Sequence, residues 1–222
     1  MKLYQGNLSP FAARVRMQVY AKSLEGREIE ILSPPGGTGS TEYKALNPTG
    51  KIPALDTGAR VLPESEVICE YLEDRYPTPA LRPAGADDRA QVRLLSRFVD
   101  MYLYPRMSPL YNQIDPASRD AALVKSGMES LDEGLAIAER LMKDGGYEGG
   151  AFAVGDGLTL ADCALVPGFF FINALMPMLG RTPAFKGFDV LAGYWAEASK
   201  GAVASRIIAE MQAALVEMMK SR

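Results

Sequence analysis

The spacing of apolar residues changes repeatedly over the first third of the chain. Residues 2–7 and 27–32 read as short strands, whereas residues 10–23 place apolar side chains four positions apart, the repeat of a helix. Gly, Pro and Ser dominate 33–40, which predicts a loop. The following pattern predicts two short strands, at 52–56 and 60–62, and then a helix at 66–76.

The element order of this first part resembles a small α/β thioredoxin-like domain with a mixed sheet. Three prolines and one glycine at 76–86 predict a linker, and no convincing strand follows it. Helical periodicity then continues to the end of the chain, with predicted helices at 87–112, 118–143, 160–176, 190–199 and 202–220. The predicted fold class is therefore an α/β N-terminal domain (1–80) followed by an all-α C-terminal domain (87–222).

The amino-acid composition excludes several kinds of partner and catalytic site. The 222 residues include 24 basic and 27 acidic side chains, and residues 1–80 alone carry 9 and 10, so neither part is basic enough for a nucleic-acid partner. The absence of histidine excludes His-ligated zinc and histidine-activated nucleophiles, and we predict no metal site. The two cysteines are far apart, which favours a reduced, cytoplasmic chain.

One apolar segment, 163–180, approaches the length of a membrane span. It contains Pro167, Gly168, Asn173 and Pro177, which favour a helix buried in the protein core. The N-terminal residues do not resemble a targeting signal. We therefore expect no membrane partner.

Three short motifs point to a site. Ser9 and Pro10 form a typical helix start, which by itself indicates only capping. In the segment 47–55, Pro53 lacks an N–H at a strand start, so the adjacent backbone of Ile52 is available to an extended peptide ligand. Glu64 and Ser65 precede a helix, where amides suit a carboxylate and Glu64 suits an ammonium. Together the motifs predict a pocket for a small zwitterionic peptide.

These motifs resemble the cytosolic glutathione transferases over nearly the whole chain. The matching segments are SPFAARVR at 9–16, NPTGKIPAL at 47–55, PESEVICEYL at 63–72, YPTPALRP at 76–83 and GDGLTLADCALVP at 155–167. The resemblance implies a thioredoxin-like glutathione-binding domain, a helical domain that contributes the second-substrate pocket, glutathione as co-substrate, and a homodimer.

The resemblance also implies residue roles. Pro53 would be cis, Ile52 would pair its backbone with the cysteinyl part of glutathione, Glu64 and Ser65 would hold the γ-glutamyl end, and Lys51 would contact the glycyl carboxylate. Ser9 matches the activating residue of serine-type members, which include theta, delta and zeta-like classes. Tyr4 is the rival donor of a tyrosine-type enzyme. The sequence assigns no role to Glu66.

The sequence gives weaker signals for the second-substrate pocket. By resemblance, Tyr104, Met107, Ser108 and Tyr111 lie on one helix over the thiol, and Phe11 is a further candidate beside Ser9. Met and Tyr suit an adaptable apolar wall, but the same stripe is also typical of a helical core.

The favoured function is a glutathione transferase that adds the thiolate to an apolar electrophilic small molecule, as in detoxification. A glutathione-dependent isomerase, dehalogenase or etherase is an alternative, because each begins from the same thiolate. A non-catalytic binding module of the same fold is another. A protein-thiol reductase is disfavoured, because serine stands at position 9 where omega-like members have cysteine.

Overall fold

The computed structural model describes residues 1–220 and groups them into two compact units. The first unit comprises Met1–Arg82 together with the last helix, α9 (Ala202–Lys220), and the second comprises Pro83–Gly201. Helix α9 was predicted as part of the range 87–222, and its contacts group it with the first unit, where it packs along α1 (Pro10–Ala21).

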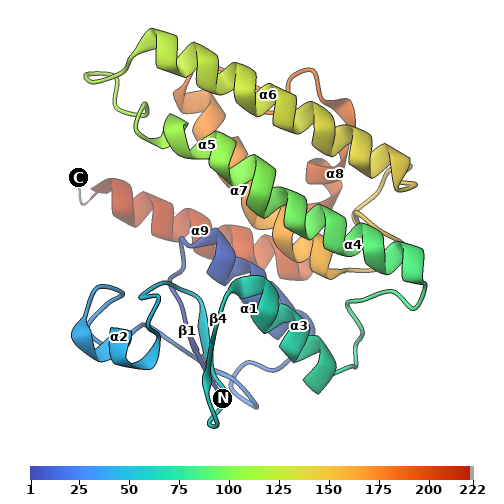
Figure 1. Cartoon of the computed structure of the whole chain (residues 1–222). Coiled ribbons are helices and arrows are strands. Elements are labelled where there is room, and N and C mark those ends of the chain that lie inside the picture. The colour runs from blue at the N-terminus through green and yellow to red at the C-terminus, as the bar shows by residue number, and fades with distance from the viewer. Residues whose placement is uncertain (221–222) are drawn as a thin grey trace. The chain divides into compact units, whose positions relative to one another are not determined.

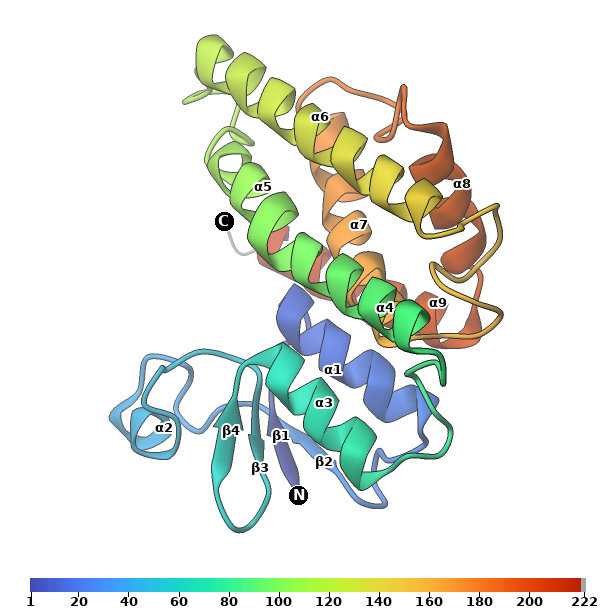
Figure 2. The same cartoon turned by 45° about the vertical axis from the view of Figure 1, so that its right-hand side comes forward.

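A mixed sheet lies at the centre of the first unit (Figure 2). Its strands run in the order β2-β1-β3-β4, with β1 parallel to β2 and antiparallel to β3, and β4 antiparallel to β3. Their bounds are Lys2–Tyr4 for β1, Glu30–Leu32 for β2, Ala54–Asp56 for β3 and Val61–Pro63 for β4. The predicted thioredoxin-like domain with a mixed sheet is confirmed.

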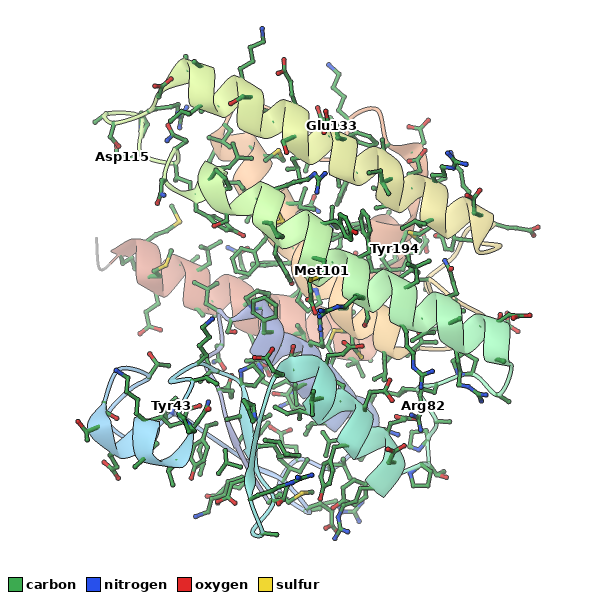
Figure 3. The ribbon with its side chains drawn as sticks, in the orientation of Figure 1. Tyr43, Arg82, Met101, Asp115, Glu133 and Tyr194 are labelled. Atoms are coloured by element: carbon green, nitrogen blue, oxygen red, sulfur yellow. The ribbon has the colours of Figure 1, made fainter. Side chains whose placement is uncertain are left out.

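Helices cover both faces of this sheet. In Figure 2, α1 and α3 (Ser65–Arg75) lie on one side and α2 (Thr41–Leu46) lies on the other. Tyr43 of α2, labelled in Figure 3, packs its ring edge-on against Tyr4 at a centroid distance of 5.8 Å, with Ala54 beside them. Helix α2 was not predicted from the sequence, because its six residues make fewer than two helical turns and are too few to show a period.

The second unit is helical. Its elements are α4 (Ala86–Phe98), a π-helical stretch (Val99–Leu103), α5 (Tyr104–Tyr111), α6 (Ala121–Asp144), α7 (Leu160–Met178) and α8 (Asp189–Ala198). Helix α4 packs against α7, and α5 packs against α6 (Figure 1). The single helix expected at 87–112 is divided by the π turn just before Pro105, whose missing N–H and bulky ring disrupt regular α-helical bonding.

Helix α7 has the length and mean hydropathy, 1.5, of a membrane span. However, 78% of its most apolar window is buried inside the protein. This agrees with the predicted core helix.

Candidate active site

Ser9 caps the N-terminus of α1. Its Oγ accepts a hydrogen bond from the Ala12 N–H at 3.2 Å, and Pro10 occupies the first helical turn. A hydroxyl that accepts one bond can still donate its own proton. The positive end of α1 and this hydroxyl therefore form a local site suited to an anion.

The chain before β3 is fixed from inside the first unit. The peptide bond between Ile52 and Pro53 is cis, as the resemblance implied. The Lys51 carbonyl accepts hydrogen bonds from the Tyr43 hydroxyl at 2.7 Å and from the buried Asn47 amide at 2.8 Å. These two donors hold the backbone just before Ile52, while the Lys51 side chain remains exposed.

A cavity of about 890 Å³ in the first unit is lined by both Ser9 and Ile52. Its lining comprises Gln5, Gly6, Asn7, Leu8, Ser9, Ser33, Ile52, Glu210, Ala213, Ala214, Glu217 and Met218. Five of these residues come from α9, which the sequence analysis treated only as an apolar stripe. The helical spacing of Glu210, Ala213, Ala214 and Glu217 is the signal that could have indicated a second, more polar face.

Gly6 allows the loop before Ser9 to approach Ile52 closely. A Cβ at position 6 would lie 2.9 Å from Ile52 Cδ1. Gly6→Ala is therefore expected to turn the end of the Ile52 side chain away and, because the Ile52 backbone stays in place, to raise KM for glutathione by no more than about 3-fold. Steady-state kinetics at varied glutathione concentration checks this expectation. The matched control is Gly39→Ala, because nothing lies within 4 Å of a Cβ there; a rise of about 10-fold or more for Gly6→Ala would contradict the prediction.

The start of α3 carries the predicted γ-glutamyl contacts. Glu64 is exposed and precedes the helix with φ of 69°, whereas Ser65 is buried. Buried Arg14 of α1 donates to the Ser65 Oγ at 3.3 Å and pairs with Glu66 at 3.0 Å. Glu66 thus has the structural role that the sequence did not assign: it neutralises a buried guanidinium beside Ser65.

The other predicted site residues have different surroundings. Ile52 lines the cavity, but Lys51, Pro53, Glu64 and Ser65 lie outside its wall, as does Phe11. The glutathione-binding role of those residues stays a prediction. The rival donor Tyr4 is 7% exposed and packs in the cluster with Tyr43, Ala54 and Ile52.

The remaining candidates lie on α5 in the second unit. Met107 is fully buried, as expected if these residues belong to the helical core. Burial also raises the pKa of Tyr111, whose ring packs against Phe171. Ser108 is exposed and Tyr104 half-buried. A second-substrate role for these residues stays a prediction.

Two family models match most of the chain. Residues 3–80 match the family described as "Glutathione S-transferase, N-terminal domain", and residues 114–197 match "Glutathione S-transferase, C-terminal domain". The chain belongs to the glutathione S-transferase family. It is therefore an enzyme, with glutathione as its co-substrate.

Similar members include two isomerases. A maleylpyruvate isomerase of Ralstonia sp. is 34% identical over 206 residues, covering 87% of this chain and 92% of the relative. A maleylacetoacetate isomerase of Pseudomonas aeruginosa is 32% identical over 197 residues, covering 86% and 91%. A solved holo structure of a maleylpyruvate isomerase, described as a bacterial zeta-class glutathione S-transferase, aligns with a TM-score of 0.73 at 31% identity, covering 93% of this chain and 96% of that one.

Proposed function

We propose that Ser9 hydrogen-bonds to the glutathione sulfur, and that the activated thiolate attacks an apolar electrophilic small molecule. One observation carries this proposal: Ser9, whose hydroxyl caps the N-terminus of α1, lines the same cavity as Ile52, which is joined to Pro53 by a cis peptide bond. The backbone of Ile52 suits an extended peptide, and the helix start suits an anion.

The missing histidine does not prevent this chemistry. A free thiol with pKa about 8.5 is only a few per cent ionised at neutral pH. A hydrogen bond to the charged sulfur contributes about 1.5–3 kcal/mol, or about 1–2 pKa units if it acts on the thiolate. Thiolate then makes up about a quarter to three quarters of bound glutathione at pH 7. The thiol proton leaves to solvent, so no protein base is required.

Isomerisation is the second candidate, and it is favoured by the two isomerases among the similar proteins. In that reaction the thiolate adds to a carbon–carbon double bond, the bond rotates, and elimination returns the thiolate. The cavity suits either reaction. Of its two carboxylates, Glu210 is paired with Arg16 at 2.6 Å and with Arg206 at 3.0 Å, which leaves Glu217 as the carboxylate of the wall that has no ion pair within residues 1–220.

A paired assay distinguishes the two reactions. We expect the enzyme to conjugate glutathione to chlorodinitrobenzene, consuming one glutathione per product. Maleylpyruvate would instead be isomerised with no net loss of glutathione. Faster turnover of maleylpyruvate would reverse our preference, and glutathione binding without turnover of either compound would contradict the proposed reaction altogether.

We further propose a cytoplasmic homodimer. Cys69 and Cys163 are buried and form no disulfide bond, which is consistent with a reducing compartment. The dimer is proposed by resemblance to the family.

A further inference from the structure

Arg16 of α1 connects the loop before Ser9 to α9. Its side chain is 1% exposed. Nη1 donates to Asn7 Oδ1 at 2.9 Å and to Glu210 Oε2 at 2.6 Å, while Nη2 donates to the Asn7 backbone carbonyl at 2.9 Å. One guanidinium therefore binds both the side chain and the backbone of the residue two positions before Ser9.

Glu210 holds this guanidinium in place. Its carboxylate also accepts from the Tyr20 hydroxyl at 3.2 Å and from Arg206 Nε at 3.0 Å, so its own orientation is fixed. Burial lowers the pKa of Arg16, and the charge of Glu210 opposes that shift. A buried guanidinium without its carboxylate would seek other acceptors or solvent.

Asn7 lies in the loop between β1, which ends at Tyr4, and α1, which begins at Pro10. The hydrogen bonds of a strand or helix therefore do not fix its position. Within this loop, the Ser9 N–H donates to the Gly6 carbonyl at 3.0 Å, and Gln5 Nε2 donates to Asn7 Oδ1 at 3.1 Å. Both contacts are local to the loop. Arg16 supplies the tie from Asn7 to the rest of the first unit, with the planar two-pronged geometry that a lysine cannot reproduce.

We propose that Arg16 and Glu210 are positioning residues for thiol activation: they hold Asn7 so that the Ser9 hydroxyl faces the sulfur of bound glutathione. The proposal rests on the proposed role of Ser9. Because Glu210 lies on α9, this helix would help to position Ser9 as well as line the cavity. A displacement of about 1 Å in a catalytic hydrogen-bond donor is enough to slow a reaction substantially.

The test is Glu210→Gln, which keeps the size of the side chain and removes its charge. The first measurement is the pKa of glutathione bound to the full-length enzyme, from the ultraviolet absorbance of the thiolate. We expect this pKa to rise, and kcat/KM for chlorodinitrobenzene to fall about 3- to 10-fold at pH 6.5, mostly through kcat. The difference from wild type should shrink at high pH, where the thiol ionises without help.

The direction of the pKa shift separates positioning from simple charge effects. Removing a negative charge from the cavity wall would, by relief of Coulomb repulsion alone, stabilise the thiolate and lower its pKa. Glu217→Gln removes the other cavity carboxylate, seven positions along α9, and is expected to show that lower or unchanged pKa. A rise in Glu210→Gln but not in Glu217→Gln therefore supports positioning.

Two further variants keep the test decisive. Glu25→Gln weakens the ion pair between Glu25 and Arg206 of α9 but leaves the contacts of Arg16 with Asn7 and Glu210, so it should not move the thiol pKa. Arg16→Lys keeps the positive charge but lacks the two-pronged guanidinium, and it should raise the thiol pKa even if Glu210→Gln fails to fold.

Two results would overturn this inference alone, provided that Ser9→Ala raises the thiol pKa. One is an unchanged thiol pKa in Arg16→Lys. The other is an unchanged or lower thiol pKa in a folded Glu210→Gln. An unchanged thiol pKa in Ser9→Ala would overturn the proposed function itself.

Discussion

Ser9→Ala is expected to fold and to bind glutathione, but to lose about 10- to 100-fold in kcat/KM. The variant removes a hydrogen bond to the thiolate, worth about 1.5–3 kcal/mol for a charged acceptor, while the backbone around Ile52 still binds the peptide. Because the pKa of the bound thiol rises, the loss should be largest below pH 7 and smallest above pH 9. Rate profiles across pH, combined with the ultraviolet titration of the thiolate, check both parts of this prediction.

The control must separate catalysis from helix capping, since the Ser9 Oγ also accepts the Ala12 N–H. Ser9→Gly also lacks the hydroxyl, but glycine is a tolerated N-cap and costs only a few tenths of a kcal/mol. We expect Ser9→Gly to be more stable than Ser9→Ala and equally impaired in activity. If Ser9→Gly recovers wild-type kcat/KM, Ser9 is only a cap.

Asp162→Ala should have the largest effect on stability. The buried Asp162 carboxylate accepts from the Ala153 N–H at 2.7 Å, the Tyr194 hydroxyl at 2.9 Å, and the Thr159 N–H and hydroxyl at 2.8 and 2.9 Å. Burial raises the pKa of Asp162, and these donors oppose the rise. Its removal orphans several buried donors at the start of α7, so the free energy of unfolding should fall by about 3–5 kcal/mol.

Urea unfolding followed by circular dichroism measures this loss. The matched control is Asp189→Ala, which removes an exposed carboxylate from the first turn of α8. That change should cost less than about 1 kcal/mol. If the two variants were equally stable, the buried network around Asp162 would not have the role assigned to it.

Local sequence patterns were sufficient to predict most of the helices and strands. Ser9 and Pro10 were recognised as the start of α1, because a favoured N-cap residue is followed directly by a residue favoured in the first helical turn. The missed element, α2, has six residues, which is too few for periodicity to exceed chance.

The site was predicted only in part, because its contacts join distant segments. Ser9 and Ile52 were recognised from short motifs, and the structure brings them to one cavity. Nothing in the sequence near Glu66 indicated that it would neutralise Arg14, since 52 positions separate them. The sequence also did not indicate that Arg16 would pair with Glu210, because 194 positions separate them.

The sequence by itself determined the fold class, the helix start that carries Ser9, and the absence of any histidine base, because these depend on residue identity and short-range spacing. Tertiary structure decided that α9 packs beside α1, and that two of its carboxylates reach the cavity. The physical reason is that burial of an apolar stripe is not directional: it requires α9 to pack somewhere, but only the folded surface of α1 selects the partner.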